Sequence, residues 1–145
     1  MGELEDSVRE KEEKEICVDT DILIDFLKGK GPGLPAYKRW RNESSVAITS
    51  VTAFELLVGA RGSGQREKRY EEARSLIEQQ GNVLPFDKSS AEKASEIGAE
   101  LRQHGKGIEI RDLFNAAICI SQGIPLLTKN KEHYQRVTGL KLVPV

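Results

Sequence analysis

Five short apolar segments, separated by stretches with the character of helices, constrain the fold of this chain more than any other feature. Segments this short are typical of strands that are buried on both faces of a sheet. The segments are residues 16–18, 46–48, 82–85, 125–128 and 140–143. Between them, the sequence predicts helices over 21–28, 34–42, 50–60, 65–80, 89–103, 112–122 and 130–137. This alternation predicts an α/β domain with a mainly parallel central sheet of about five strands.

Length and composition narrow the choice further. A chain of 145 residues, 38% of them hydrophobic, is long enough for one domain with a core and too apolar for a disordered protein. Cys17 and Cys119 stand far apart without a CxxC motif, which argues against a zinc ribbon or a disulfide framework. No apolar run is long enough to span a membrane and no signal peptide opens the chain, so we expect a cytoplasmic protein.

The charges are unevenly distributed along the chain. Residues 1–15 hold seven acids and three bases, and we interpret them as an acidic, flexible extension that precedes a domain over 16–145. Residues 28–42 hold five bases and no acid, with Tyr37 and Trp40 among them. A basic stretch with aromatic residues suits nucleic acid, and it equally fits a solvated helix face.

Carboxylates follow the predicted strands at the edge where α/β domains carry their functional sites. Asp19 and Asp21 follow the first strand, Glu55 lies one turn into the helix after the second, and Asp112 opens the helix before the fourth. The carboxyl ends of parallel strands lie at one edge of the sheet, so we expect these acids to converge. Clustered carboxylates without a histidine or cysteine nearby favour a hard cation such as Mg²⁺ or Mn²⁺.

Each acid also has a purely structural alternative. Asp19 or Asp21 could cap helix 21–28, and Asp112 could cap the helix that follows it. Glu55 stands three residues after Thr52, which is the spacing of a capping box. All four acids occur at predicted strand–helix edges, and this joint placement favours the metal site.

The helix over 50–60 carries a further expectation. Either of two hydroxyl residues, Thr49 and Ser50, is a suitable N-cap for it. Its apolar residues predict the face that packs on the core. This predicted face consists of Val51, Phe54, Leu57 and Val58.

Four segments, in order, resemble the motifs of one known family. They are residues 18–29 (VDTDILIDFLKG), 49–60 (TSVTAFELLVGA), 110–117 (IRDLFNAA) and 126–134 (LLTKNKEHY). Together they resemble the motifs of PIN-domain ribonucleases of the VapC toxin type, and the likeness covers about residues 16 to 145. The resemblance implies a three-layer fold in which helices flank the sheet. It also implies cleavage of RNA with Mg²⁺ or Mn²⁺, homodimers, and inhibition by a small cognate antitoxin protein.

The resemblance also assigns roles to residues of this chain. Asp19, Glu55 and Asp112 would be the catalytic acids that hold the metal, and an activated water would displace the 3′ oxygen from phosphorus. Thr20, Asp21, Asn115 and Asn130 would support the metal site. The bases that could follow the RNA backbone are Lys28, Lys30, Lys38, Arg39, Arg41, Arg61, Lys129 and Lys131.

This chain departs from the family pattern at three places. Asn115 stands where the family mostly has an aliphatic residue, and Asn130 and His133 fall where acids are common. The acidic extension is not part of the family's core pattern. These departures leave open whether a fourth acidic ligand is replaced.

Two other functions remain as alternatives. A PIN fold could act as a catalytically weak module that binds RNA or protein. A phosphotransferase of the haloacid-dehalogenase type also opens with Asp-x-Asp after a buried strand. That family requires a later acid pair, and Thr128-Lys129-Asn130 offers none.

Overall fold

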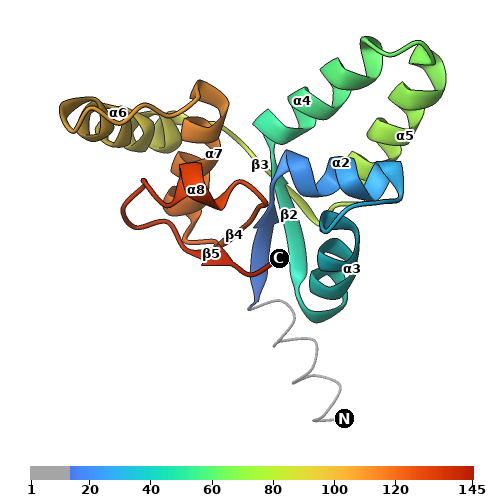
Figure 1. The fold of residues 1–145 in the computed structure, drawn as a ribbon, viewed down its shortest axis with the longest axis horizontal. Coiled ribbons are helices and arrows are strands. Elements are labelled where there is room, and N and C mark those ends of the chain that lie inside the picture. Colours follow the sequence, from blue (N-terminus) through green and yellow to red (C-terminus); the bar gives the residue numbers. More distant parts are fainter. Residues whose placement is uncertain (1–13) are drawn as a thin grey trace.

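The computed structural model describes residues 14–145, in which five strands form one parallel sheet (Figure 1). The strands are β1 (Glu15–Val18), β2 (Ser45–Thr49), β3 (Asn82–Leu84), β4 (Leu126–Leu127) and β5 (Leu142–Val143), in the spatial order β3-β2-β1-β4-β5. All four neighbouring pairs are parallel, which confirms the predicted fold class. Most of the predicted acidic extension, residues 1–13, lies outside the described residues.

Seven helices in the described part of the chain connect and cover the strands. They are α2 (Thr20–Lys28), α3 (Gly33–Glu43), α4 (Ser50–Arg61), α5 (Arg66–Glu78), α6 (Lys88–Gln103), α7 (Ile110–Gln122) and α8 (Lys131–Tyr134). Every predicted helix is present, with ends shifted by a few residues. None of the helices in residues 14–145 is long and apolar enough to cross a membrane.

The sheet is covered on both faces, which makes three layers (Figure 1). Successive side chains of a strand point to opposite faces, so Ile16 and Val18 pack with α2, α3, α4 and α5, whereas Cys17 packs with α6, α7 and α8. Both cysteines are free and buried in the core. Burial on both faces explains why the three inner strands, β1, β2 and β4, appear in the sequence as short, continuous apolar runs, whereas the edge strands β3 and β5 are less buried.

The helix N-termini show which of the acids at the strand ends are N-caps. Asp19 does cap α2, since its side chain accepts a hydrogen bond from the backbone N–H of Thr20. Asp112 is not a cap, because α7 begins after Glu109, whose side chain accepts from the N–H of Arg111. The prediction that Asp112 opens its helix was therefore wrong, because the helix begins two residues earlier, at Ile110.

The structure also shows which of Thr49 and Ser50 is the N-cap of α4. Thr49 is its N-cap and accepts from the N–H of Thr52, whereas the Ser50 hydroxyl accepts from the N–H of Phe86. The Ser50 side chain thus bonds the segment after β3 and does not cap the helix. Glu55 takes no part in a capping box, because its carboxylate is bonded to Thr20 across the site.

The predicted core face of α4 is right for Val51 and Leu57, which are partly buried against the core, and wrong for Phe54 and Val58. The buried side chains are Thr52, Leu56 and Ala60, whereas Phe54 and Val58 are 56% and 50% exposed. The helix has apolar residues on both sides, so its sequence pattern does not single out one face. An exposed Phe–Val pair one turn apart is available to contact another molecule.

Candidate active site

The acids at the strand ends line one open cavity. It lies at the carboxyl edge of the sheet, towards which β1 and β2 point in Figure 1 and where α2 and α4 begin. The chain reverses direction into a helix after β1 and again after β2, and these connections place acids from distant parts of the sequence side by side. The residues of its wall are Asp19, Thr20, Asp21, Ile24, Glu55, Asp112 and Asn130.

Asp19 is the most buried of these acids. Its Oδ1 accepts from the N–H of Thr20 at 2.9 Å, and its Oδ2 accepts from the Thr128 hydroxyl at 2.8 Å. Burial, assisted by the nearby charge of Asp21, raises the pKa of Asp19 to about 7 although the hydrogen bond from Thr128 opposes the shift. A buried carboxylate that has lost most of its hydration and is fixed in orientation is strongly stabilised in its charged form by a nearby cation.

Asp21 stands beside Asp19 and is held by the loop after β4. Its Oδ2 accepts from the backbone N–H of Lys129 at 2.9 Å and from the Thr128 hydroxyl at 3.4 Å. Its Oδ1 is buried and has no hydrogen-bond donor among the described residues. Burial raises the pKa of Asp21, against the effect of the Lys129 N–H. An unpaired buried carboxylate oxygen is a free acceptor for a cation.

Glu55 reaches the cavity from α4. Its Oε1 lies 3.1 Å from the Thr20 hydroxyl, and its Oε2 lies 3.7 Å from Nη1 of Arg111. Burial raises the pKa of Glu55, while Thr20 and Arg111 act in the opposite direction. Arg111 therefore supplies positive charge at the cavity before any cation is bound.

Asp112 faces Asn130 across the cavity. Its Oδ1 accepts from the Tyr134 hydroxyl at 3.1 Å, and its Oδ2 accepts from Nδ2 of Asn130 at 3.3 Å. Burial raises the pKa of Asp112, and the hydrogen bond from Tyr134 partly offsets this. Asn115, on the same helix, is buried and donates to Asp19 at 3.4 Å.

Three residues near the cavity were missed in the sequence. Thr128 bonds both Asp19 and Asp21, Tyr134 bonds Asp112, and Arg111 pairs with Glu55. Thr128 had a usable signal, because it is the polar residue that directly ends a buried strand. Nothing in the sequence pointed to Tyr134, because an aromatic residue on a short helix is most often simply part of the hydrophobic core.

The donor set fits a hard divalent cation. Carboxylate and amide oxygens are the ligands that Mg²⁺ and Mn²⁺ prefer, and the orphaned Oδ1 of Asp21 supplies a free acceptor. Among residues 14–145, no three Asp, Glu, His or Cys side chains already stand in a metal-holding arrangement. Glu55 is engaged by Thr20 and Arg111, so it would have to turn towards the other acids to share an ion.

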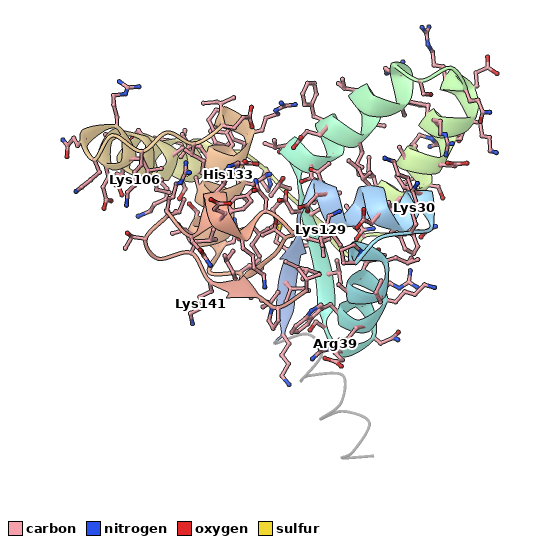
Figure 2. The ribbon with its side chains drawn as sticks, in the orientation of Figure 1. Lys30, Arg39, Lys106, Lys129, His133 and Lys141 are labelled. Carbon is pink, nitrogen blue, oxygen red and sulfur yellow. The ribbon has the colours of Figure 1, made fainter. Side chains whose placement is uncertain are left out.

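The predicted RNA-contacting bases lie in several places around the molecule. Figure 2 shows Lys129 near the centre of the view and Arg39 on α3 near the bottom of the described part. Lys129 lies beside the cavity, because its backbone N–H donates to Asp21. Lys129 is bound to Asp25, Arg39 pairs with Glu43, and Arg61 stacks over Tyr70. Arg41 stacks over Phe26 and Tyr37. Lys28, Lys30 and Lys38 are exposed on α2 and α3 and in the turn between them, and Lys131 begins α8.

Comparison with known sequences agrees with this geometry. Residues 16–140 match the PIN domain family. The chain is 31% identical to ribonuclease VapC1 of Methanocaldococcus jannaschii over 135 residues, which cover 92% of this chain and 90% of that protein. It is 32% identical to the tRNA(fMet)-specific endonuclease VapC of Shigella flexneri, covering 86% of this chain and 92% of that protein.

Comparison with solved structures gives the same fold. The DNA-bound VapBC of Salmonella typhimurium superposes with a TM-score of 0.81 at 26% identity, covering 90% of this chain and 97% of that chain. Other solved structures with this fold are toxin–antitoxin complexes.

Proposed function

The chain belongs to the PIN-domain family, as a relative of the VapC ribonucleases, and we propose that it hydrolyses RNA with a divalent metal ion, Mg²⁺ or Mn²⁺, held by Asp19, Glu55 and Asp112. The observation that carries this proposal is the single cavity that gathers these three acids with Asp21 and Asn130. The family match leaves no support for a phosphotransferase of the haloacid-dehalogenase type.

Each side chain has a distinct role in this proposal. A divalent cation held there would polarise a phosphoryl oxygen and make a water molecule more acidic. Asp19 is fixed from both oxygens, whereas Glu55 bonds Thr20 and would turn from it to share an ion. Arg111 lies at the rim, where its guanidinium can take a phosphate oxygen once Glu55 turns to the cation.

The proposed substrate is RNA, and transfer RNA is the first RNA to test. The Shigella relative is a tRNA(fMet)-specific endonuclease, and the exposed Lys28 and Lys30 near the end of α2 add positive charge for a phosphate backbone.

The test is cleavage of tRNA by the purified chain, with and without EDTA and with Mg²⁺ or Mn²⁺ restored. Asp112→Asn keeps the side-chain shape and an acceptor for Tyr134, so we expect a folded protein. Its cleavage rate should fall by at least about two orders of magnitude, as when a major electrostatic group is lost. Cleavage that persists in EDTA, or a fully active variant, would contradict the metal site. A wild-type chain that binds RNA without cutting it would favour the binding-module alternative.

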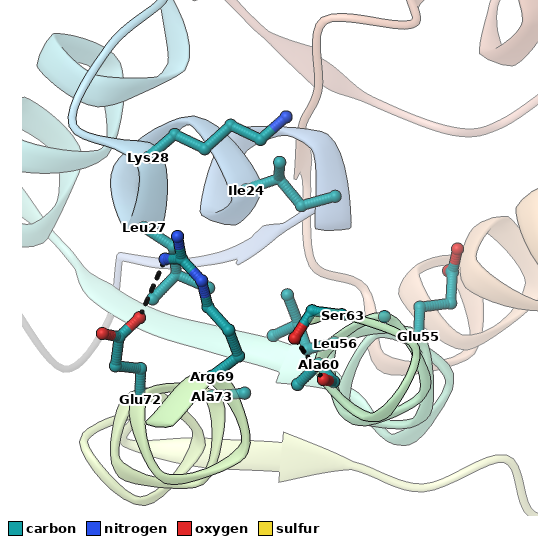
Figure 3. Close-up of a pocket in the computed structure, with 11 residues that line it drawn as sticks. Ile24, Leu27, Lys28, Glu55, Leu56, Ala60, Ser63, Arg69, Glu72 and Ala73 are labelled. Carbon is teal, nitrogen blue, oxygen red and sulfur yellow. Dashed lines mark hydrogen bonds and ion pairs between the residues drawn. The ribbon is translucent and has the colours of Figure 1, made fainter. Parts of the chain in front are cut away.

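We also propose a small antitoxin as the partner, seated in the groove of Figure 3. The groove lies between α2, α4 and α5 and has an apolar floor that includes Leu27, Leu56 and Ala60. Lys28 stands at its rim, and Glu55 marks the end that opens towards the acidic cavity. A peptide with apolar side chains would fit the floor, and a basic side chain at its end would face the acids. Such a peptide would block access to the site.

Gly59 offers a clean test of the groove. A Cβ at Gly59 meets no atom within 4 Å, so Gly59→Glu adds a charge to the groove wall while favouring the helix. If a short open reading frame lies beside the gene, co-expression with its product should give a stable complex for the wild type and not for Gly59→Glu. Gly64→Glu, also in open space but outside the groove, is the matched control. A Gly59→Glu chain that still forms the complex would place the antitoxin elsewhere.

A homodimer is the second proposed assembly. Phe54 and Val58 project from α4, where they are 56% and 50% exposed. The same chain has an apolar hollow between α6 and α7, whose wall includes Phe86, Gly98, Leu113 and Phe114. Projecting side chains and a hollow on one chain are the elements of a self-complementary, two-fold contact.

A further inference from the structure

We propose that Tyr134 is a positioning residue for the metal site, whose buried hydroxyl fixes Asp112 relative to Asp19 through Asn115. The inference rests on the proposed function and adds a residue from α8 that the motifs did not assign. Its basis is a continuous set of hydrogen bonds behind the cavity, on the side away from solvent.

The hydrogen bonds connect two acids that come from different parts of the fold. The Tyr134 hydroxyl donates to Oδ1 of Asp112 at 3.1 Å. Nδ2 of Asn115 lies 3.4 Å from that hydroxyl oxygen and 3.4 Å from Oδ1 of Asp19. The amide carries two hydrogens, so it can donate to both at once. Asp19 at the end of β1 and Asp112 on α7 are thereby held by one shared network.

The direction of these bonds is fixed by the carboxylates of Asp19 and Asp112, which accept. Oδ1 of Asn115 accepts from the Thr49 hydroxyl at 2.6 Å, and that hydroxyl accepts from the backbone N–H of Thr52 at 3.0 Å. A carboxylate accepts, so the Asn115 atom that faces Asp19 is the Nδ2 donor, and the amide oxygen on the other side accepts from the Thr49 hydroxyl. The Asn115 amide is then oriented with its NH₂ group towards Tyr134 and Asp19. The Tyr134 hydroxyl, having accepted from Asn115, is left to donate to Asp112.

Burial makes this network rigid. The exposed fractions of Thr49, Asn115 and Tyr134 are 0%, 1% and 0%. Buried polar groups that satisfy one another in a low dielectric strengthen each other and resist rearrangement. Asp112 is only partly buried and could otherwise turn towards water. Residues that orient a ligand from behind commonly change metal affinity about 10- to 100-fold when removed.

The test is calorimetric titration of Mn²⁺ into the full chain and its variants, with RNA absent. Tyr134→Phe keeps the ring and removes only the hydroxyl, so we expect a folded protein whose Mn²⁺ dissociation constant is about tenfold higher. Tyr37→Phe is the matched control, because Tyr37 is an equally buried tyrosine whose hydroxyl bonds Gln80 away from the cavity. Its Mn²⁺ affinity should equal that of the wild type.

Asn115→Ala supplies a second, independent variant. Because Asn115 and Tyr134 act through one network, the double variant should bind Mn²⁺ about as weakly as the weaker single variant, and a fully additive loss would contradict the shared network. Wild-type affinity in a folded Tyr134→Phe chain would overturn the positioning role. If the wild type binds no Mn²⁺, or Asp112→Asn binds it equally well, the proposed metal site itself fails and the positioning role fails with it.

Discussion

The ammonium of Lys129 lies 2.8 Å from Oδ2 and 2.9 Å from Oδ1 of Asp25, which joins the loop after β4 to α2. Asp25 is buried and also accepts from the backbone N–H of Gly33 at 2.8 Å. A Cβ at Gly31 would lie 2.5 Å from Oδ2 of Asp25, so only glycine leaves room for the carboxylate. The same Lys129 donates its backbone N–H to Asp21, so the pair supports the cavity wall.

Breaking the Lys129–Asp25 pair should therefore cost stability. Lys129→Gln removes the cation from a largely enclosed carboxylate, and we expect the free energy of unfolding to fall by about 2 kcal/mol, as for a hydrogen bond between charged groups. Urea denaturation measures this. Lys93→Gln is the control, because the Lys93–Glu96 pair is exposed and should contribute less than about 1 kcal/mol. Equal effects of the two changes would mean that the Lys129–Asp25 pair has no special structural role.

The raised pKa of Asp19 predicts how stability depends on pH. The folded protein holds this proton with a pKa of about 7, whereas an unfolded chain releases it near pH 4. The favourable contribution is complete below pH 4 and is lost as the pH rises through 7. We expect this group alone to lower the free energy of unfolding of the metal-free chain by roughly 4 kcal/mol between pH 4 and pH 8.

The comparison that isolates this effect is wild type against Asp19→Asn. The variant lacks the buried charge, so its stability relative to the wild type should rise from pH 5 to pH 8 in the absence of metal. Mn²⁺ at pH 8 should stabilise the wild type more than the variant, because only the wild type offers the carboxylate. A stability difference that stays constant with pH would mean that Asp19 titrates normally.

Asn130→Asp should make the cavity more dependent on metal. The change replaces the Nδ2 donor to Asp112 with a second carboxylate, so the metal-free chain should become less stable through repulsion. With metal, the added oxygen ligand should tighten Mg²⁺ binding, which calorimetry can measure. His133→Ala, at an exposed position on the neighbouring helix, should leave the affinity unchanged. No gain for Asn130→Asp would mean that residue 130 does not reach the ion.

The exposed face of α4 predicts the oligomeric state. Phe54→Glu places a charge in the proposed apolar contact, so we expect a monomer where the wild type is a dimer, as measured by analytical ultracentrifugation. Val145→Glu changes an exposed apolar residue at the C-terminus and should keep the dimer. A Phe54→Glu chain that remains dimeric would place the interface on another surface.

The sequence alone was sufficient to predict an element where a local pattern is compatible with only one structure. Short apolar runs bounded by polar residues gave the five strands, and the acids that follow them lie at the carboxyl edge of the sheet, where Asp19, Glu55 and Asp112 share a cavity. A strand buried on both faces must be apolar at every position, so it is visible without knowledge of its neighbours.

Tertiary structure decided what depends on contacts between distant segments. Only part of the core face of α4 could be predicted, because Phe54 and Leu56 are equally apolar and only the packing of α5 and the sheet buries Leu56. Tyr134 looked like an ordinary core aromatic until folding brought its hydroxyl to Asp112, 22 residues away in sequence. Local sequence therefore determines which residues can line a site, whereas the packing of whole elements determines which of them hold one another in place.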